Sequence, residues 1–314
     1  MSTDAAPRVV VIGESLVDIV HRTAGGVDEA PGGSPANVAL TLGRIGRAPT
    51  LVTRLADDDR GRRVRGWLEQ SGVTVDAVAA PRTSTATALL DAGGAATYTF
   101  DLEWDLGGDV ARLTEEVLTS ADLIHVGSVG AFLEPGAGHV AALVRAAHGR
   151  AIVTYDPNIR PSLVRDPQAV RARVAELLGI ADVVKASDED LRWLHPGRDA
   201  IEVARECLIG GPALVVVTCG ADGAIAVTAN GEVVVPAVTT EVVDTVGAGD
   251  TFMGALIDGL LAREPGLGLR ASGGGIRPGE LDALLRRSAA AAAITVSRPG
   301  ADPPRREELL ARTA

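Results

Sequence analysis

Short apolar runs alternate with amphipathic stretches along most of the chain, which predicts strands and helices in turn. The run VVVIG at 9–13 is apolar throughout, as expected of a strand buried on both faces. The following SPANVALTLGRIG has helical spacing, and we expect Ser34 as its N-cap with Pro35 at the first helical position. Further strands are predicted at 50–56, 121–129, 151–158, 181–187 and 213–220, and further helices at 61–72, 138–148, 167–179 and 199–209. This alternation indicates an α/β fold with a mostly parallel sheet between two layers of helices.

Two segments depart from this alternation. The stretch TATALLDAGGAATYTFDL, residues 85–102, is typical of two strands around a glycine-rich turn, with no helix between them. Residues 14–24 also have an extended pattern. We therefore expect a small antiparallel flap, made from about 14–24 and 83–103, within a single domain that spans 1–314. The segment 264–280 is predicted to be a loop between two helices.

The stretch VVDTVGAGDTFMGALIDG, residues 242–259, places small residues and an acid where another helix begins. Phe252 and Leu256 belong to an apolar pattern with helical spacing. The first N–H groups of a helix have no partner within it, and small residues let an anion approach them. Asp250 would repel that anion, unless the carboxylate is a base beside developing negative charge. From these residues alone, a tight strand-to-helix turn capped by Asp250 explains the pattern as well.

Composition narrows the classes of partner. The chain has 314 residues, of which 46% are hydrophobic, and a formal net charge of -11, which argues against nucleic acid or an anionic membrane as a partner. Its two cysteines lack metal-binding spacing, and its first residues lack a signal-peptide pattern, so we expect a cytoplasmic protein. No apolar run is long enough to span a membrane.

Two common phosphate-binding fingerprints are absent from the sequence. A P-loop needs GxxxxGK[ST], but Lys185, the only lysine, follows ADVV. A dinucleotide fingerprint needs GxGxxG, and GAGDTF fails at the third glycine, which argues against an NAD(P)-dependent oxidoreductase. The single lysine is either a chance survivor in an arginine-rich chain or the mark of a position that needs a compact ammonium group.

A second candidate site lies in PGGSPAN, residues 31–37. Gly32 and Gly33 allow close approach to the backbone, and Asn37 offers an amide from the first turn of the predicted helix. Asp18, on the extended segment after the first strand, could accept two sugar hydroxyls or simply face solvent. Mixed donors and acceptors of this kind suit a polyhydroxy ligand, although each feature is weak by itself.

Taken together, these motifs resemble the PfkB, or ribokinase-like, family of carbohydrate kinases. The resemblance runs from about residue 8 to 304 and rests on GESLVDIV, PGGSPANVALTLGRIG, RLADDDRGRRVRGWLEQSGV, YDPNIRPSLV, VKASDEDL, TCGADGA and VVDTVGAGDTFMGAL in the family's order. DPNxRxxL and KASDEDL are most similar to bacterial fructokinases. The resemblance implies a ribokinase-like fold with a small β-sheet lid and ATP-dependent phosphorylation of a primary hydroxyl of a sugar. It also implies Mg²⁺, a monovalent cation such as K⁺, and the homodimer that many relatives form through the lid.

The resemblance also implies roles for individual residues. Asp250 matches the family's catalytic base, which deprotonates the attacking hydroxyl. The residues matched to its anion hole are Gly247, Ala248 and Gly249. The residues matched to sugar binding are Asp18, Gly32, Gly33, Asn37 and Arg160, with Tyr98, Phe100 and Glu103 of the flap as further candidates. Those matched to the nucleotide-binding turn are Thr218, Gly220 and Gly223, and those matched to the monovalent-cation site are Asp244 and Val246.

The chain departs from the family at the Asn-x-x-Glu motif, which helps organise Mg²⁺ and the phosphates. The equivalent stretch is SDED, which places Ser187 and Asp190 at those positions. We expect Ser187 near the nucleotide and Asp190 near the metal. Lys185 lies two residues earlier and is predicted to reach the ATP phosphates.

The identity of the sugar stays open at this point. The flap sequence YTFDLEWDLG differs from the aromatic-rich version of typical fructokinases. Fructose is the first expectation, and 2-keto-3-deoxygluconate, whose carboxylate Arg160 could bind, is the alternative. A purine nucleoside is disfavoured because only 3% of the residues are aromatic. A non-catalytic sugar or nucleotide sensor on the same fold is the alternative from another functional class, although a sensor would not need to keep Asp250.

Overall fold

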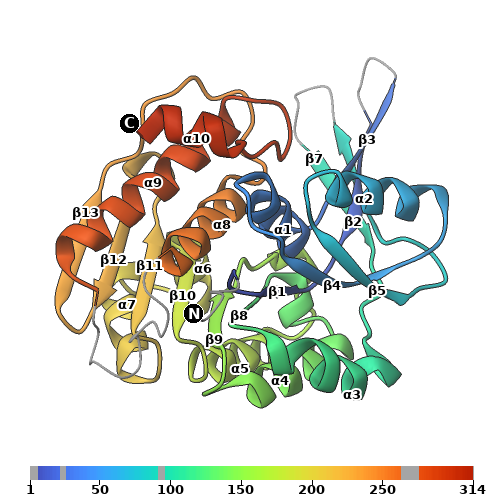
Figure 1. Cartoon of the computed structure of the whole chain (residues 1–314), viewed down its shortest axis with the longest axis horizontal. Coiled ribbons are helices and arrows are strands. Elements are labelled where there is room, and N and C mark those ends of the chain that lie inside the picture. The colour runs from blue at the N-terminus through green and yellow to red at the C-terminus, as the bar shows by residue number, and fades with distance from the viewer. Residues whose placement is uncertain (1–5, 22–25, 91–95, 263–275, 314) are drawn as a thin grey trace, which may run out of the picture.

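The computed structural model describes residues 6–21, 26–90, 96–262 and 276–313, and its strands form two separate sheets (Figure 1). The larger sheet has nine strands in the order β13-β12-β11-β10-β9-β8-β1-β4-β5. Its parallel strands are β1 (Val9–Ile12), β4 (Thr50–Leu55), β5 (Thr74–Ala79), β8 (Leu123–Gly127), β9 (Ile152–Asp156), β10 (Val183–Ser187) and β11 (Leu214–Thr218). Two antiparallel strands follow at one edge, β12 (Ala224–Thr228) and β13 (Gly231–Val235). The predicted mostly parallel sheet is thus confirmed.

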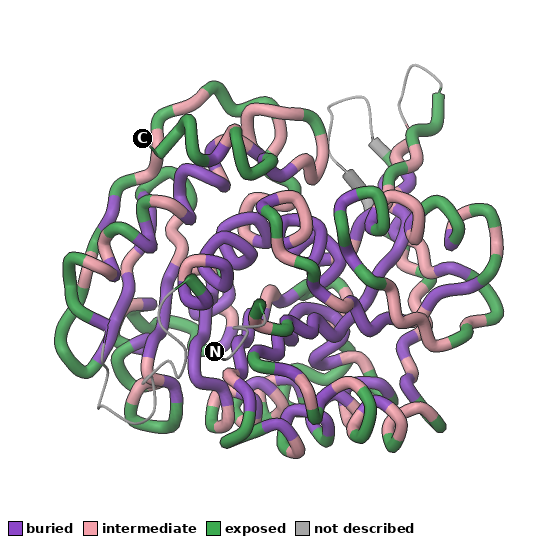
Figure 2. The backbone as a smooth tube through the Cα atoms, viewed as in Figure 1, coloured by how far each residue is buried: buried purple, intermediate pink, exposed green. Residues whose placement is uncertain are grey.

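Helices cover both faces of this sheet, as its apolar strands predict. Along β1, Val9 and Val11 pack into one core while Val10 and Ile12 pack into the other. The first core is covered by α1 (Ser34–Arg44), α2 (Asp59–Glu69), α8 (Ala248–Leu261) and α9 (Pro278–Val296), with α10 (Arg306–Thr313) packed outside them. The second core is covered by α4 (Gly136–Ala147), α5 (Pro167–Leu178), α6 (Asp188–Leu194) and α7 (Ala200–Ile209). Figure 2 shows the central strands buried and the outer faces of the helices exposed.

Short helical segments complete the connections between these elements. They are η1 (Gly107–Asp109), α3 (Val110–Arg112), η2 (Leu113–Val117), η3 (Leu118–Ser120), η4 (Val129–Ala131), η5 (Pro161–Leu163) and η6 (Gly220–Asp222). Among the described helices, none is both long enough and apolar enough to cross a membrane.

The smaller sheet stands beyond the β5 edge of the larger one, at the upper right of Figure 1. Its strands are β3 (Val27–Gly32), β2 (Leu16–His21), β6 (Thr85–Leu90) and β7 (Ala96–Asp101), in that spatial order. The prediction of a wholly antiparallel flap was wrong, because β2 and β6 are parallel. They follow β1 and β5, which point the same way in the large sheet, so both leave it in the same direction. Whether this sheet closes over a ligand stays a prediction.

The predicted helix starts are close to the observed ones. α8 begins at Ala248, directly after its N-cap Gly247. α1 begins at Ser34, but its N-cap is Gly33, so the predicted cap was wrong by one residue. The Ser34 hydroxyl makes no cap hydrogen bond, because it donates to a side chain of another helix. Most of the predicted loop at 264–280 lies outside the described residues, and its end was wrong, because α9 already begins at Pro278.

A glycine lets α1 and α8 pack closely against each other. A Cβ atom at Gly254 of α8 would lie 2.7 Å from the Cβ and Cγ2 atoms of Thr41 in α1, and 3.3 Å from the carbonyl oxygen of Val38. Since both helices are rigid, that space cannot open locally, and the absence of a side chain sets the distance between them.

Gly254→Ala is predicted to destabilise the protein by about 1–3 kcal/mol, because its methyl group would push α1 and α8 apart. Gly66→Ala is the matched control: Gly66 is also helical, but a Cβ atom there meets nothing within 4 Å. The control should stabilise the protein by about 0.5–1 kcal/mol through helix propensity alone. Urea unfolding measures both effects, and an equal response of the two variants would contradict the packing argument.

Candidate active site

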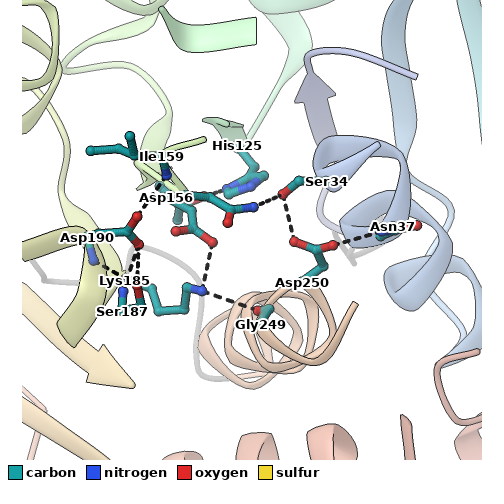
Figure 3. A network of polar contacts seen from close by, with 12 residues as sticks. Ser34, Asn37, His125, Asp156, Ile159, Lys185, Ser187, Asp190, Gly249 and Asp250 are labelled. Atoms are coloured by element: carbon teal, nitrogen blue, oxygen red, sulfur yellow. Dashed lines mark hydrogen bonds and ion pairs between the residues drawn. The ribbon is translucent and has the colours of Figure 1, made fainter. Parts of the chain in front are cut away.

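Polar residues gather where the first turns of α1 and α8 meet the ends of β9 and β10 (Figure 3). Asp156 is the last residue of β9 and Ser187 the last of β10, while Ser34 opens α1 and Asp250 lies in the first turn of α8. The carboxyl ends of parallel strands are the usual place for ligands in an open α/β sheet, because helix starts and strand ends meet there.

Asp250 is held in one orientation by donors from α1. The Ser34 hydroxyl donates to Oδ1 of Asp250 at 2.6 Å, and Nδ2 of Asn37 donates to Oδ2 at 2.8 Å. Nδ2 of Asn158 in turn donates to the Ser34 hydroxyl at 2.8 Å. Asp250 is only 6% exposed. The structure thus brings together Asn37 and Asp250, two predicted site residues from opposite ends of the chain.

The backbone at the start of α8 keeps N–H groups available beside this carboxylate. The Ala248 amide donates to the Thr245 carbonyl at 3.3 Å, and the Thr251 amide donates to the Gly247 carbonyl at 2.8 Å. Within the described residues, the amides of Gly249 and Asp250 have no acceptor. A helix start with free N–H groups can bind an anion. The assignment of Gly247, Ala248 and Gly249 as an anion hole stays a prediction.

Gly247 is required by the turn that opens the helix. Its φ of 75° is in the left-handed region, and a Cβ atom there would lie 2.7 Å from the Cβ atom of Ala301. Ala301 therefore packs directly against this turn.

Lys185 lies beneath the first turn of α8. Its neighbours Val184 and Ala186 face the core on the other side of the sheet, so Lys185 faces α8. Its Nζ atom is 2.8 Å from Oδ2 of Asp156 and 3.5 Å from the carbonyl oxygen of Gly249. Lys185 is 3% exposed. The predicted contact with ATP phosphates stays a prediction, and among the described residues the ammonium group is bound by Asp156.

Burial and nearby charges have opposite effects on the pKa of each member of the Lys185–Asp156 pair. Burial alone lowers the pKa of Lys185, but the carboxylates of Asp156, Asp190 and Asp250 hold that pKa above its usual value. Burial raises the pKa of Asp156 to about 7, although the Lys185 ammonium group opposes the rise. The Oδ1 atom of Asp156 has no hydrogen-bond partner among the described residues. Oδ2 of Asp156 also lacks a partner of hydrogen-bond geometry there, but it is ion-paired with Lys185, so Oδ1 is the oxygen of Asp156 that these residues leave for a ligand.

Asp190 and Ser187 form the capping box of α6. The Ser187 hydroxyl and amide both donate to Oδ2 of Asp190, at 2.7 and 2.9 Å, and the Ile159 amide donates to Oδ1 at 2.8 Å. Both oxygens of Asp190 thus already accept from the protein. Its assignment to the metal, and that of Ser187 to the nucleotide, stay predictions.

The predicted sugar-binding residues also converge on this region. Asp18 of β2 faces the backbone of Gly32 at the end of β3, so closely that a Cβ atom at Gly32 would collide with the carboxylate. Burial raises the pKa of Asp18 to about 6, against the effect of the nearby Arg160 charge. Arg160 itself donates to Oδ1 of Asn158 at 2.6 Å. Asn158 therefore links the sugar-binding candidates to Ser34 and Asp250.

The remaining candidates lie around this network without a described contact to Asp250. Thr218 ends β11, Gly220 opens the turn η6 and Gly223 follows it, and the backbone φ of both glycines is positive. Asp244 orders the loop before α8, since its carboxylate accepts from the amides of Val246 at 3.0 Å and Gly300 at 2.8 Å.

The flap candidates are only partly described. Phe100 lies on β7, and Glu103 forms an ion pair with Arg54 at 2.8 Å. Tyr98 is also on β7, but its side chain lies outside the described residues. Their role at a sugar pocket stays a prediction.

Sequence reasoning missed four residues of this region as site residues. They are Glu14, Ser34, Asp156 and Asn158. For Asp156 and Asn158 a signal existed, because polar residues at the carboxyl end of a predicted parallel strand mark the ligand edge of the sheet. No local pattern could reveal that the Ser34 hydroxyl is bound to a residue 216 positions away.

Glu14 is a buried carboxyl group at the base of this region. Its Oε2 atom accepts a hydrogen bond from the Gly130 amide at 2.7 Å. Burial raises the pKa of Glu14 to about 7, while backbone hydrogen bonds, the Ser128 side chain and the Arg160 charge oppose the rise. Near neutral pH this group is therefore partly protonated.

Known proteins share this arrangement of elements. The model of the pfkB family carbohydrate kinases matches residues 6–308. A fructokinase from Rhizobium leguminosarum bv. trifolii is 36% identical over 267 residues, which cover 80% of this chain and 79% of that protein. Fructokinase-2 from Solanum habrochaites is 32% identical, covering 94% of this chain and 92% of that protein. The crystal structure of a fructokinase with bound ATP from Xylella fastidiosa has a TM-score of 0.89 at 27% identity and covers 97% of both chains.

Glu14→Gln is predicted to reduce the loss of stability as the pH rises. The unfolded chain releases the Glu14 proton near pH 4.5, whereas the folded chain holds it until about pH 7. The folded state thus binds more protons in this interval, so its free energy of unfolding falls with rising pH, by at most roughly 3 kcal/mol from this group. Glutamine is neutral at every pH and keeps an oxygen for the Gly130 amide.

Urea unfolding at about pH 5 and about pH 8 measures this difference. The wild type should lose more stability between the two than Glu14→Gln, and the exposed Glu115→Gln should behave as the wild type. Equal losses in all three proteins would show that Glu14 titrates normally.

Proposed function

Because this chain belongs to the pfkB family of carbohydrate kinases, we propose that it transfers the terminal phosphoryl group of ATP to a primary hydroxyl group of fructose. The observation that carries the proposal is the similarity to curated fructokinases, which reaches 36% identity and in the plant relatives extends over 94% of this chain. The oriented Asp250 carboxylate, with free N–H groups beside it, supports a phosphoryl-transfer site on chemical grounds.

In this proposal Asp250 is the general base. Ser34 and Asn37 hold its two oxygens in place, so an approaching hydroxyl group meets a carboxylate that needs no reorientation. The proton of the attacking hydroxyl moves to Asp250 as the new oxygen–phosphorus bond forms and the bond to ADP breaks. In the segment Gly247 to Gly249 at the start of α8, the Gly249 amide, which has no acceptor among the described residues, would favour the charge on the phosphoryl oxygens.

Lys185 supports the same charge from beneath the helix. Its ammonium group is fully buried against Asp156 and reaches the carbonyl of Gly249. A positive charge in a low-dielectric interior acts strongly on an anion above it. We expect Thr218, Gly220 and Gly223 to contact the nucleotide, with Ser187 at its phosphate end.

Mg²⁺, when bound with ATP, would neutralise phosphate charge. The described residues contain no group of three or more acidic, His or Cys side chains placed to hold a metal. This fits an ion that is held mostly by phosphates and water, as Mg²⁺ usually is in kinases. Asp156, with its unpartnered Oδ1 atom, and Asp190 are the carboxylates that would hold it. Asp244 and the backbone of Val246 would hold K⁺.

The proposal also assigns a role to the small sheet. As a lid formed by about 14–24 and 83–103, it would cover the sugar, exclude water and suppress ATP hydrolysis. Asp18, Gly32, Gly33 and Arg160 would bind the sugar from the lid and the adjoining loops. A second copy of the chain could pair through the exposed face of this sheet.

Release of ADP with a panel of sugars is the test of this function. We expect the highest kcat/KM for fructose among fructose, 2-keto-3-deoxygluconate, ribose, tagatose and adenosine, and sugar-dependent release at least about 100-fold slower from Asp250→Asn. Arg160→Gln should weaken activity with 2-keto-3-deoxygluconate by about 10-fold to 100-fold more than with fructose, since only the former offers a carboxylate. Preference for 2-keto-3-deoxygluconate would replace fructose as the substrate, and silence with every sugar would favour a sensor.

A further inference from the structure

A cavity lies at the ends of α1 and α8 that are remote from Asp250. It is partly open to solvent and has a volume of about 860 Å³. It is lined by the segment before β1, the loop after α1, the last turns of α8, the first half of α9 and the start of α10. A volume of this size is typical of small-molecule sites.

The charged residues of this cavity are mostly arginines. They are Arg8, Arg47, Arg287 and Arg306, against the acids Asp258 and Glu280. This lining carries a formal charge of +2, which is four positive side chains less two negative ones, although the whole chain carries -11. A local excess of arginine in an acidic protein needs a specific explanation.

Structural ion pairs explain only part of this excess. Asp258 binds Arg47 at 2.6 Å and Arg287 at 2.7 Å, so both of its oxygens are occupied. Glu280 is paired with Arg277, outside the cavity, at 2.7 Å. The acids of the cavity therefore already have cationic partners.

Of the four cavity arginines, Arg8 and Arg306 take no part in these ion pairs. Both are exposed, and within the described residues neither guanidinium group has an acidic partner. The backbone of Arg8 is anchored by its N–H, which donates to Oδ2 of Asp122 at 2.7 Å. Arg306 begins α10 and lies over Gly46, where a Cβ atom would be 3.2 Å from its NH1 atom. Two guanidinium groups thus lie at the wall of one cavity, and no acidic group of the described residues pairs with them.

We propose that this cavity is a second binding site, which takes a small phosphorylated metabolite. A phosphate group with about two negative charges matches two unpaired guanidinium groups, whose planar forks bind phosphate oxygens in pairs. The rest of the cavity is lined partly by apolar side chains such as Leu284 and Leu310, which suit the carbon skeleton of an organic ligand. Inorganic phosphate would leave most of the volume unfilled.

A ligand in this cavity would contact α1 and α8, the two helices that position Asp250. The loop after α1 and the last turns of α8 both line it, and the first turns of the same helices carry Asn37 and Asp250. Gly254 packs closely against Thr41, so the two helices are in direct contact between the cavity and Asp250. Occupation should therefore also change the kinetics of the reaction at Asp250.

Calorimetric titration of the purified protein with glucose 6-phosphate, citrate and inorganic phosphate tests the site. A saturating non-hydrolysable ATP analogue keeps the phosphate end of the Asp250 site filled. The wild type should bind glucose 6-phosphate more tightly than the other two probes. Arg8→Ser/Arg306→Ser should bind it at least about 10-fold more weakly, because two charge-assisted contacts are lost. Arg192→Ser/Arg286→Ser removes two exposed arginines outside the cavity and should bind as the wild type does.

Three results would overturn the proposal. They are the absence of glucose 6-phosphate binding below about 10 mM, equal affinity in the cavity variant, and tighter binding of citrate than of glucose 6-phosphate. Thermal unfolding without ligand checks that the variants fold, and the single charge reversal Arg306→Glu replaces the double variant if that one does not. The outcome of the binding experiment does not depend on which sugar the protein phosphorylates. A change in KM or kcat caused by glucose 6-phosphate in the wild type, and absent in the cavity variant, would support the link to Asp250.

Discussion

Two hydrogen bonds to the Asp250 carboxylate, from Ser34 and Asn37, set the geometry on which the rest of the site depends. They join the first turns of α1 and α8, which only tertiary packing brings together. The helices must approach closely for both donors to reach the acid, and Gly254 against Thr41 allows that approach. The Asp250 carboxylate, the free N–H groups at the start of α8 and the helix crossing thus form one structural unit.

The Lys185–Asp156 ion pair is buried beneath this unit. A functional role explains its presence better than a contribution to stability does. A buried ion pair contributes little net stability, because desolvation offsets most of the Coulomb attraction. Lys185 and Asp156 nevertheless lie under the turn where phosphoryl charge is proposed to develop. The space there is narrow, since a Cβ atom at Gly249 would lie 3.1 Å from the Lys185 Nζ atom. A compact ammonium group fits this space better than a planar guanidinium group, which favours the functional explanation of the only lysine in the chain.

The α/β architecture and the helix start before Asp250 could be predicted from the sequence. The physical reasons for this also explain why other features could not be predicted. Strands buried on both faces leave continuous apolar runs, and the glycines before Asp250 mark a helix start with free N–H groups. β3 was missed because half of its residues are exposed and the strand carries no apolar alternation. The bond from Ser34 and the pairing of Lys185 with Asp156 depend on how α1, α8, β9 and β10 meet. Only the tertiary structure fixes such long-range contacts.

A double-mutant cycle on kcat tests most directly the claim that Ser34 acts by orienting Asp250. Asp250→Asn should lower kcat by about 100-fold to 10,000-fold, the range expected for loss of a general base. Ser34→Ala should lower kcat about 10-fold in the wild type, with little change in the KM for the sugar, and should have no further effect in the Asp250→Asn background. The same 10-fold loss in both backgrounds would show that Ser34 acts independently of Asp250, and an unchanged kcat in Asp250→Asn would refute the base itself.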